Sequence, residues 1–118
     1  MYHEEALHTD PAVRRQCLAA FLAAAPDCDA IIVQHAPHVS SLYRICADLG
    51  RRIPRDLGVI CMQDPEILLD FAPAVSGFRL PEFALGEQGV ELLNRIISEG
   101  IPVPEMQMRY AFTPRPSL

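Results

Sequence analysis

Two short apolar runs separated by one helical pattern constrain the fold of this chain more than any other feature. The first run covers residues 30–33, and the second covers residues 57–62. Between them, apolar residues recur at helical spacing over residues 39–49, and Gly50 then ends the pattern. Strands joined by a single helix pair in parallel through a right-handed crossover, and unbroken apolar strands are typical of buried parallel sheets. The stretch therefore predicts a parallel strand–helix–strand unit.

Polar side chains follow both predicted strands at the point where each strand ends. Gln34 and His35 come after the first strand, and Gln63 and Asp64 come after the second. In open parallel sheets, ligands bind beyond the carboxyl ends of the strands. We therefore expect these four side chains to stand side by side on one rim and to form a candidate ligand site.

The rest of the chain adds helices and two shorter strands to this unit. Asp10 followed by Pro11 is typical of a helix start, and the helical spacing continues to residue 25. The patterns further predict a short helix at 65–71, a strand at 75–80, a long helix at 82–99 and a last strand at 106–112. We expect a single α/β domain with three layers, in which helices flank a mainly parallel sheet.

Charge argues against a nucleic-acid contact within these residues. The net charge is -5, and Arg51, Arg52 and Arg55 form the single basic cluster in the sequence. These arginines flank a predicted helix end, where cations interact favourably with the helix dipole. An acidic chain without a basic stripe is a poor phosphate-backbone binder, so we favour the helix-end interpretation.

Cysteine usage and hydropathy bear on the compartment. The four cysteines, Cys17, Cys28, Cys46 and Cys61, form no Cys-x-x-Cys pair, and we expect free thiols in a reducing cytosol. The chain has no apolar stretch near the roughly 18 residues that a membrane span needs, and it starts without a signal-peptide pattern. We therefore expect a cytoplasmic protein without membrane contact.

The stretches "DAIIVQHAP", "GRRIPRDLGVICMQD" and "PAVSGFRLP" follow one another along the chain. Their order resembles the carboxyl-terminal part of the LacI/GalR family of bacterial transcriptional regulators. The sequence "DAIIVQHAP" matches a family strand that ends in Asn-Asp, and "GRRIPRDLGVICMQD" matches the family's Gly-x-x-[Val/Ile]-Pro-x-Asp segment. The stretch "PAVSGFRLP" matches the family's Pro-x-Leu-Thr-Thr-Val-[Arg/Lys]-Gln segment, and the pairs Leu85-Gly86 and Leu92-Leu93 also fit. The match is collinear from about Asp10 to the end of the chain.

This resemblance implies a fold of periplasmic-binding-protein type, in which two α/β lobes close over a small effector. Residues 1–81 would form most of the carboxyl-terminal lobe, 82–100 the crossover helix of the other lobe, and 101–118 a returning strand and tail. The family's operator-binding headpiece would lie outside this chain. A homodimer is expected, and no cofactor is implied.

The resemblance also assigns site residues. Gln34 and Gln63 match effector-contacting positions, and an amide supplies both a donor and an acceptor; solvation at the rim is the alternative. His35 replaces an aspartate that would cap the next helix, and histidine caps less well. Asp64 is either a pocket residue or a turn cap. Arg79 either supplies positive charge to the pocket or the hinge or is a solvated strand residue. Because Met62 and Leu80 replace an aromatic residue and a glutamine, a standard hexose effector is not expected.

The remaining candidates concern interfaces, metals and catalysis. Val39 and Phe71 match positions near the family's dimer contact, and ordinary core packing is the alternative. His35 and His38 have a metal-compatible spacing but no third ligand, so no metal site is predicted. Ser76, His38 and Asp64 supply the residue types of a triad without a Gly-x-Ser-x-Gly elbow, so no catalysis is predicted.

Two functions therefore remain in view. The first is the ligand-sensing and dimerising part of a LacI-type regulator that binds a sugar-like or other small polar effector. The second is a transport-type solute-binding protein of the same fold, against which the missing signal sequence argues. For either function, we expect the apolar face of the 82–99 helix to be buried against another surface. The helix can fold back on its own sheet, exchange into a second chain or pack against a second copy, and we favour a homodimer.

Overall fold

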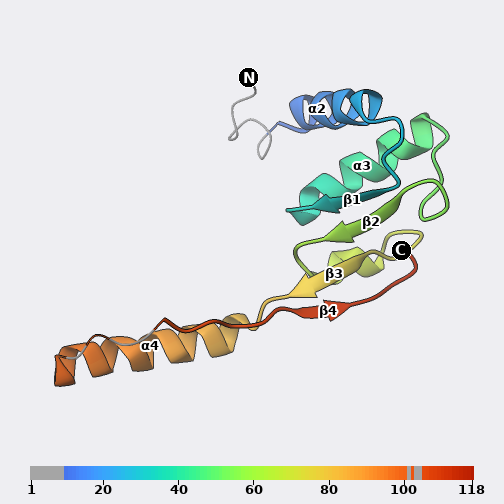
Figure 1. Cartoon of the computed structure of the whole chain (residues 1–118). Coiled ribbons are helices and arrows are strands. Elements are labelled where there is room, and N and C mark those ends of the chain that lie inside the picture. Colours follow the sequence, from blue (N-terminus) through green and yellow to red (C-terminus); the bar gives the residue numbers. More distant parts are fainter. Residues whose placement is uncertain (1–9, 101, 103–104) are drawn as a thin grey trace.

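The computed structural model describes residues 10–100, 102 and 105–118, and these form an α/β unit around one four-stranded sheet (Figure 1). The strands lie in the order β1-β2-β3-β4, which is also their order in the chain. Their bounds are Ala30–Val33 for β1, Gly58–Cys61 for β2, Ser76–Arg79 for β3 and Ala111–Thr113 for β4. The first three strands are parallel, and β4 is antiparallel to β3. The predicted fold class, α/β with a mainly parallel sheet and flanking helices, is confirmed.

Helix α2 (Pro11–Ala24) packs on α3 (Ala36–Asp48), and α3 packs on β1 (Figure 1). The Asp10 side chain caps α2 by accepting hydrogen bonds from the backbone N–H groups of Ala12 and Val13, as the sequence predicted. The N-terminus of α3 lies three residues earlier than the predicted position 39, because Pro37 is well tolerated in a first helical turn. The amphipathic pattern thus predicted the buried face of α3 but not the residue at which the helix begins.

The core lies between α3 and the sheet. Strands β1 and β2 pair in register, with Ile31 opposite Val59 and Val33 opposite Cys61. The buried apolar side chains are Leu22, Val33, Ala36, Val39, Leu42, Ile45, Cys46, Leu57, Val59, Cys61, Leu68 and Val75. All four cysteines are free thiols, and Cys46 and Cys61 are buried, as expected.

Several predicted bounds need correction. The strands predicted at 57–62 and 75–80 are each shorter by one residue at both ends, because the residues paired with neighbouring strands span only 58–61 and 76–79. The helix predicted at 65–71 is a single 3₁₀ turn, η1 (Glu66–Leu69). The strand predicted at 106–112 is wrong for residues 106–110, because pairing with β3 begins at Ala111.

The chain end is held between the starts of β2 and β3. Ser117 is buried; its hydroxyl donates to the Val59 carbonyl at 2.6 Å and accepts from the Ser76 N–H at 2.8 Å. The Val59 N–H in turn donates to the Ser117 carbonyl at 2.8 Å. These hydrogen bonds satisfy backbone groups at the starts of β2 and β3. The β2–β3 ladder, which begins with the pair Ile60 and Ser76, does not provide partners for them.

Helix α4 (Glu82–Glu99) matches its predicted bounds and extends away from the sheet (Figure 1). Gly100 ends it in a left-handed conformation, with φ of 63°. None of its side chains is buried in the described structure, and Phe83 and Ile97 are 81% and 80% exposed. The alternative in which this helix folds back on its own sheet is therefore wrong. Across the described residues, we find no helix with the length and apolar character that crossing a membrane requires.

Candidate functional site

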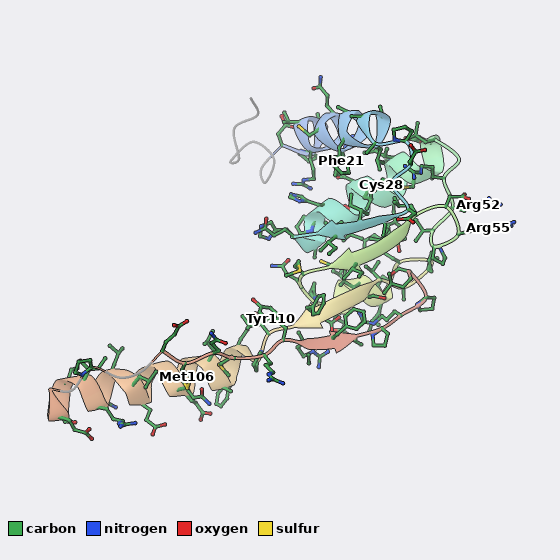
Figure 2. All side chains as sticks on the ribbon, viewed as in Figure 1. Phe21, Cys28, Arg52, Arg55, Met106 and Tyr110 are labelled. Atoms are coloured by element: carbon green, nitrogen blue, oxygen red, sulfur yellow. The ribbon has the colours of Figure 1, made fainter. Side chains whose placement is uncertain are left out.

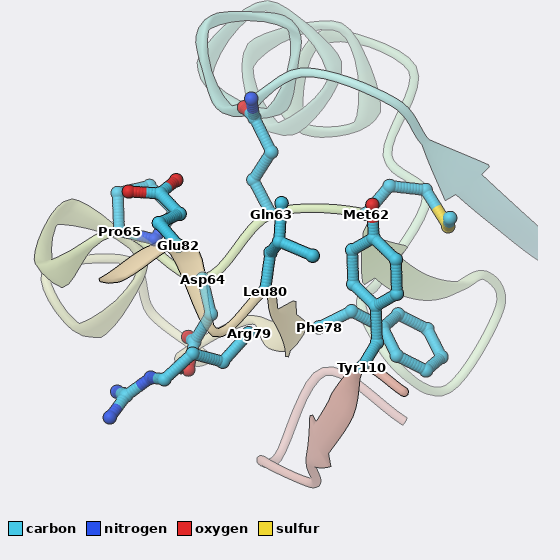
Figure 3. A pocket seen from close by; sticks show the side chains of 9 residues that line it. All are labelled: Met62, Gln63, Asp64, Pro65, Phe78, Arg79, Leu80, Glu82 and Tyr110. Carbon is cyan, nitrogen blue, oxygen red and sulfur yellow. Dashed lines mark hydrogen bonds and ion pairs between the residues drawn. The ribbon is translucent and has the colours of Figure 1, made fainter. Parts of the chain in front are cut away.

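A hollow of about 520 Å³ opens at the carboxyl ends of β2 and β3 (Figure 3). Three stretches form its wall: the segment after β2, the end of β3 with the start of α4, and the chain before β4. The lining residues are Met62, Gln63, Asp64, Pro65, Phe78, Arg79, Leu80, Glu82 and Tyr110. Its place follows from the parallel topology, because that edge of a sheet leaves space beyond the strand ends.

Gln63 ties the end of β2 to the start of α3. Its Oε1 accepts a hydrogen bond of 2.9 Å from the Ala36 N–H, and in Figure 3 its side chain extends toward that helix. His35 has the extended backbone of an N-cap residue, but in the described structure its side chain makes no capping bond. Gln63 therefore performs the capping, and its amide nitrogen has no partner among the described residues and remains available to a ligand.

Asp64 is a buried carboxylate held by groups from three segments. Its side chain is 1% exposed, and Arg115 Nη1 lies 2.6 Å from Oδ1 while also donating to the Val75 carbonyl. On Oδ2, Thr113 donates a hydrogen bond of 3.2 Å, and Arg79 Nη2 lies at 3.3 Å. Burial by itself raises the pKa of the Asp64 carboxyl, but Arg115, Thr113 and Arg79 together outweigh it and hold the pKa below its usual range. Asp64 is thus an anion that fastens the β2 end to β3, β4 and the tail.

Gly77 allows this close approach. A Cβ atom at that position would lie 2.6 Å from the Gln63 carbonyl oxygen and 3.1 Å from Asp64 Oδ1. Strand β3 therefore passes directly under the turn that carries both site residues, which fixes the floor of the hollow.

The mouth of the hollow carries opposite charges beside an aromatic wall. The Arg79 side chain is 69% exposed, and Glu82 is exposed at the first position of α4. Phe78 packs edge-on to Tyr110 with 6.5 Å between ring centroids. An amide, a guanidinium, a carboxylate and a phenol thus surround an apolar surface, a combination suited to a small polyhydroxylated molecule.

The structure brings together some of the predicted site residues and leaves others apart. Gln63, Asp64 and Arg79 line one hollow, together with Met62 and Leu80, where the chain departs from the family pattern. Gln34 and His35 follow β1 on the same edge of the sheet but do not line the hollow. Their contact with a ligand, like that of the other three, stays a prediction.

Sequence reasoning missed Phe78, Glu82 and Tyr110 as wall residues, and Arg115 as the partner of Asp64. The register of β4, with Ala111 opposite Arg79, places Tyr110 just beyond the end of β3. Side-chain character alternates along residues 106–112, but this local pattern does not reveal that pairing with β3 orients Tyr110 toward the hollow.

The two predicted dimer residues lie in or near the core. Val39 is fully buried within this chain, and Phe71 is half-buried against Tyr43, with ring centroids 5.0 Å apart. Core packing, the alternative left open by the sequence, describes both environments. Their place at an interface stays a prediction.

Other candidate groups have structural partners. The Ser76 hydroxyl donates to the Arg115 carbonyl and accepts from the Arg115 N–H, so it is part of the tail anchor. Arg51 donates to the Cys28 carbonyl, and Arg52 forms a bidentate pair with Asp56. Figure 2 shows Arg52 and Arg55 on the loop between α3 and β2, at the end of the sheet opposite the hollow. Within the described residues, no three His, Cys, Asp or Glu side chains gather as a metal site would need.

This fold and its strand-end hollow define the class of periplasmic-binding-protein-like lobes. The sequence model described as the periplasmic binding protein-like domain matches residues 1–118. The chain therefore belongs to that family, whose fold the sequence resemblance implied.

Known proteins agree with this placement. The lactose operon repressor of Rhizobium radiobacter is 28% identical over 94 residues, which cover 75% of this chain and 83% of that protein. A LacI family transcriptional regulator from Arthrobacter sp. FB24, solved in complex with lactose, is 27% identical with a TM-score of 0.67. That match covers 87% of this chain and 40% of the regulator's chain.

A further structure supports the fold alone. The LacI family transcriptional regulator from Bifidobacterium animalis subsp. lactis has a TM-score of 0.79 at 20% identity, and the match covers 92% of this chain and 40% of that one. The chain thus spans about two fifths of the length of these solved regulators. The relatives are transcriptional regulators rather than enzymes.

Proposed function

We propose that this chain is the ligand-sensing and dimerisation portion of a LacI-type DNA-binding transcriptional regulator. It binds a small effector, sugar-like or another small polar metabolite, and thereby controls operator binding by a headpiece outside these residues. The hollow beyond β2 and β3 carries this proposal, because its wall combines fixed polar groups with an aromatic side.

The chemistry of the wall supports a polyhydroxylated ligand over an apolar one. The free amide nitrogen of Gln63 is a donor, the Arg79 guanidinium is a second donor, and Glu82 is an acceptor. Tyr110 offers an aromatic face for the C–H side of a sugar ring, where the family's aromatic residue is replaced by Met62. The lactose found in the Arthrobacter relative supports the same class of ligand.

The effector site would be shared between two lobes. This chain contributes one wall, because α4 leaves the sheet at Glu82 with its apolar side chains uncovered. The relatives favour this regulator over the second candidate, a solute-binding protein of a transport system, since the matches named above are to regulators.

Ligand-observed NMR with a panel of mono- and disaccharides, lactose included, tests the proposal, since it detects the weak binding expected of one wall. Arg79→Ala and Tyr110→Ala should each weaken binding by about 1–3 kcal/mol, because a ligand group loses its partner. Arg95→Ala, on the exposed side of α4, is the matched control and should bind as the parent does. Equal binding by all variants, or binding of none of the panel, would reject the site.

A further inference from the structure

A groove lies between the start of α2 and the outer side of α3, and it shares no lining residue with the hollow. It measures about 210 Å³ and is lined by Pro11, Arg14, Arg15, Ser40, Ser41 and Arg44. Because α2 packs directly on α3, these residues come from two adjoining helices and hold fixed relative positions.

The charge of this groove is opposite to that of the chain. All ten basic residues of the sequence are arginines and the net charge is -5, whereas the described residues that line the groove include three arginines and no acidic residue. Elsewhere, Arg52, Arg79, Arg95 and Arg115 each pair with a carboxylate. In the part of the chain that the structure describes, Arg15 and Arg44 have no such pair. Arg15 and Arg44 thus bring to the groove two positive charges that no carboxylate of the described residues neutralises.

Two further contacts show how the groove is built. The Arg14 guanidinium is buried and donates a hydrogen bond of 3.2 Å to the Pro37 carbonyl, which fixes it against the first turn of α3. Ser41 is 6% exposed, and among the described residues its hydroxyl has no partner. The neighbouring Ser40 differs, because its hydroxyl already donates to the Pro37 carbonyl. Ser41 is therefore a nearly buried donor that remains available at the groove.

We propose that this groove binds a phosphate-type oxyanion, either free inorganic phosphate or the phosphoryl group of a small monoester. Guanidinium groups match phosphate oxygens with two parallel N–H bonds, and such charge-assisted bonds are the strong ones. The available volume accommodates one phosphoryl group with a few further atoms, whereas the hollow at the strand ends is more than twice as large. The protein therefore has two ligand sites of different chemistry.

Calorimetric titration of the chain with inorganic phosphate at low ionic strength tests the proposal. We expect saturable binding that weakens roughly tenfold in each of Arg15→Gln and Arg44→Gln, because each removes a charged donor. Ser41→Ala should weaken it by a smaller factor. Arg55→Gln, on the exposed loop at the amino end of β2, is the matched control and should leave the affinity unchanged.

A second measurement keeps the test independent of folding in any variant. Phosphate added to the parent chain should shift the NMR resonances of the Arg15 and Arg44 Nε–H groups and leave that of Arg55 in place. A parallel titration with O-phosphoserine distinguishes the sources, since tighter binding than phosphate indicates an esterified ligand and weaker binding indicates the free ion. No saturable heat, or equal loss of binding in the Arg55 control, would overturn the proposal.

Discussion

Gln63 Oε1 accepts the Ala36 N–H at 2.9 Å, so a side chain at the end of one strand caps the helix that follows its neighbour. This bond compensates for His35, which occupies the N-cap of α3 without capping it. It also orients Gln63, since the oxygen faces the helix and the amide nitrogen is left over. The Gln63 side chain therefore both stabilises α3 and contributes an oriented amide group to the hollow.

Gln63→Ala should destabilise the protein by about 0.5–2 kcal/mol, the usual cost of removing a helix cap. Urea denaturation followed by circular dichroism measures the change in the free energy of unfolding. Gln107→Ala, at an exposed position outside the hollow, provides the control and should leave that free energy within about 0.5 kcal/mol of the parent. An unchanged free energy in Gln63→Ala would show that solvent caps α3 equally well.

Gly77→Ala should destabilise by about 1–3 kcal/mol, because the new methyl group would lie 2.6 Å from the Gln63 backbone oxygen. The contact is with backbone, so no side-chain rotation relieves it. The matched control is Gly86→Ala in α4, where a Cβ meets open space. That substitution should raise helix stability by up to about 1 kcal/mol. Relative to the parent, the thermal unfolding temperature should therefore fall in Gly77→Ala and rise in Gly86→Ala. A shift in the same direction in both variants would contradict the close approach at β3.

Local patterns in the sequence predicted most of the elements. Strand β1 and helix α4 were predicted with their observed bounds, because an apolar run and a helical stripe mark them without help from distant residues. The residues 106–110 were mistaken for strand, since alternation alone does not reveal where pairing with β3 begins. The start of α3 was set too late, because its first turn carries His38 rather than apolar residues at helical spacing.

The site was predictable as far as strand order determines it. Gln63 and Arg79 follow or end parallel strands, so topology alone places them on one edge. The sequence did not predict that Arg115 neutralises Asp64, because 51 positions separate the two and the tail must first be anchored through Ser117. Tyr110 is similar, since only pairing of β4 with β3 aims it at the hollow.

Acid should weaken the fold through Asp64. A carboxyl whose pKa is lower in the folded than in the unfolded chain stabilises the fold above its unfolded pKa, about 3.9, and that stability is lost as pH falls through the folded pKa. Asp64→Asn removes this dependence, so its free energy of unfolding should fall less than the parent's between pH 7 and pH 3.

Asp56 needs to be separated from this effect. The hydrogen bonds from Arg52 hold the pKa of the partly exposed Asp56 below its usual range as well. Urea titrations at both pH values should therefore compare the parent, Asp64→Asn, Asp56→Asn and the double variant. If Asp64→Asn has the same acid dependence as the parent, Arg115 does not stabilise the Asp64 anion in solution.

The exposed face of α4 should drive association of two chains. Val90, Leu93 and Ile97 are all exposed, and covering each fully would contribute about 1.5–3 kcal/mol. The apolar side chains of α3, by contrast, are already buried in the chain's own core, so α4 is the better interface. We expect light scattering across a concentration series to detect a homodimer. Leu93→Glu should shift that equilibrium toward monomer, while Asn94→Glu, which adds the same charge at the next position, should not. A strict monomer that also binds no hydrophobic dye would contradict this expectation, because α4 would then be stable with its apolar face in water.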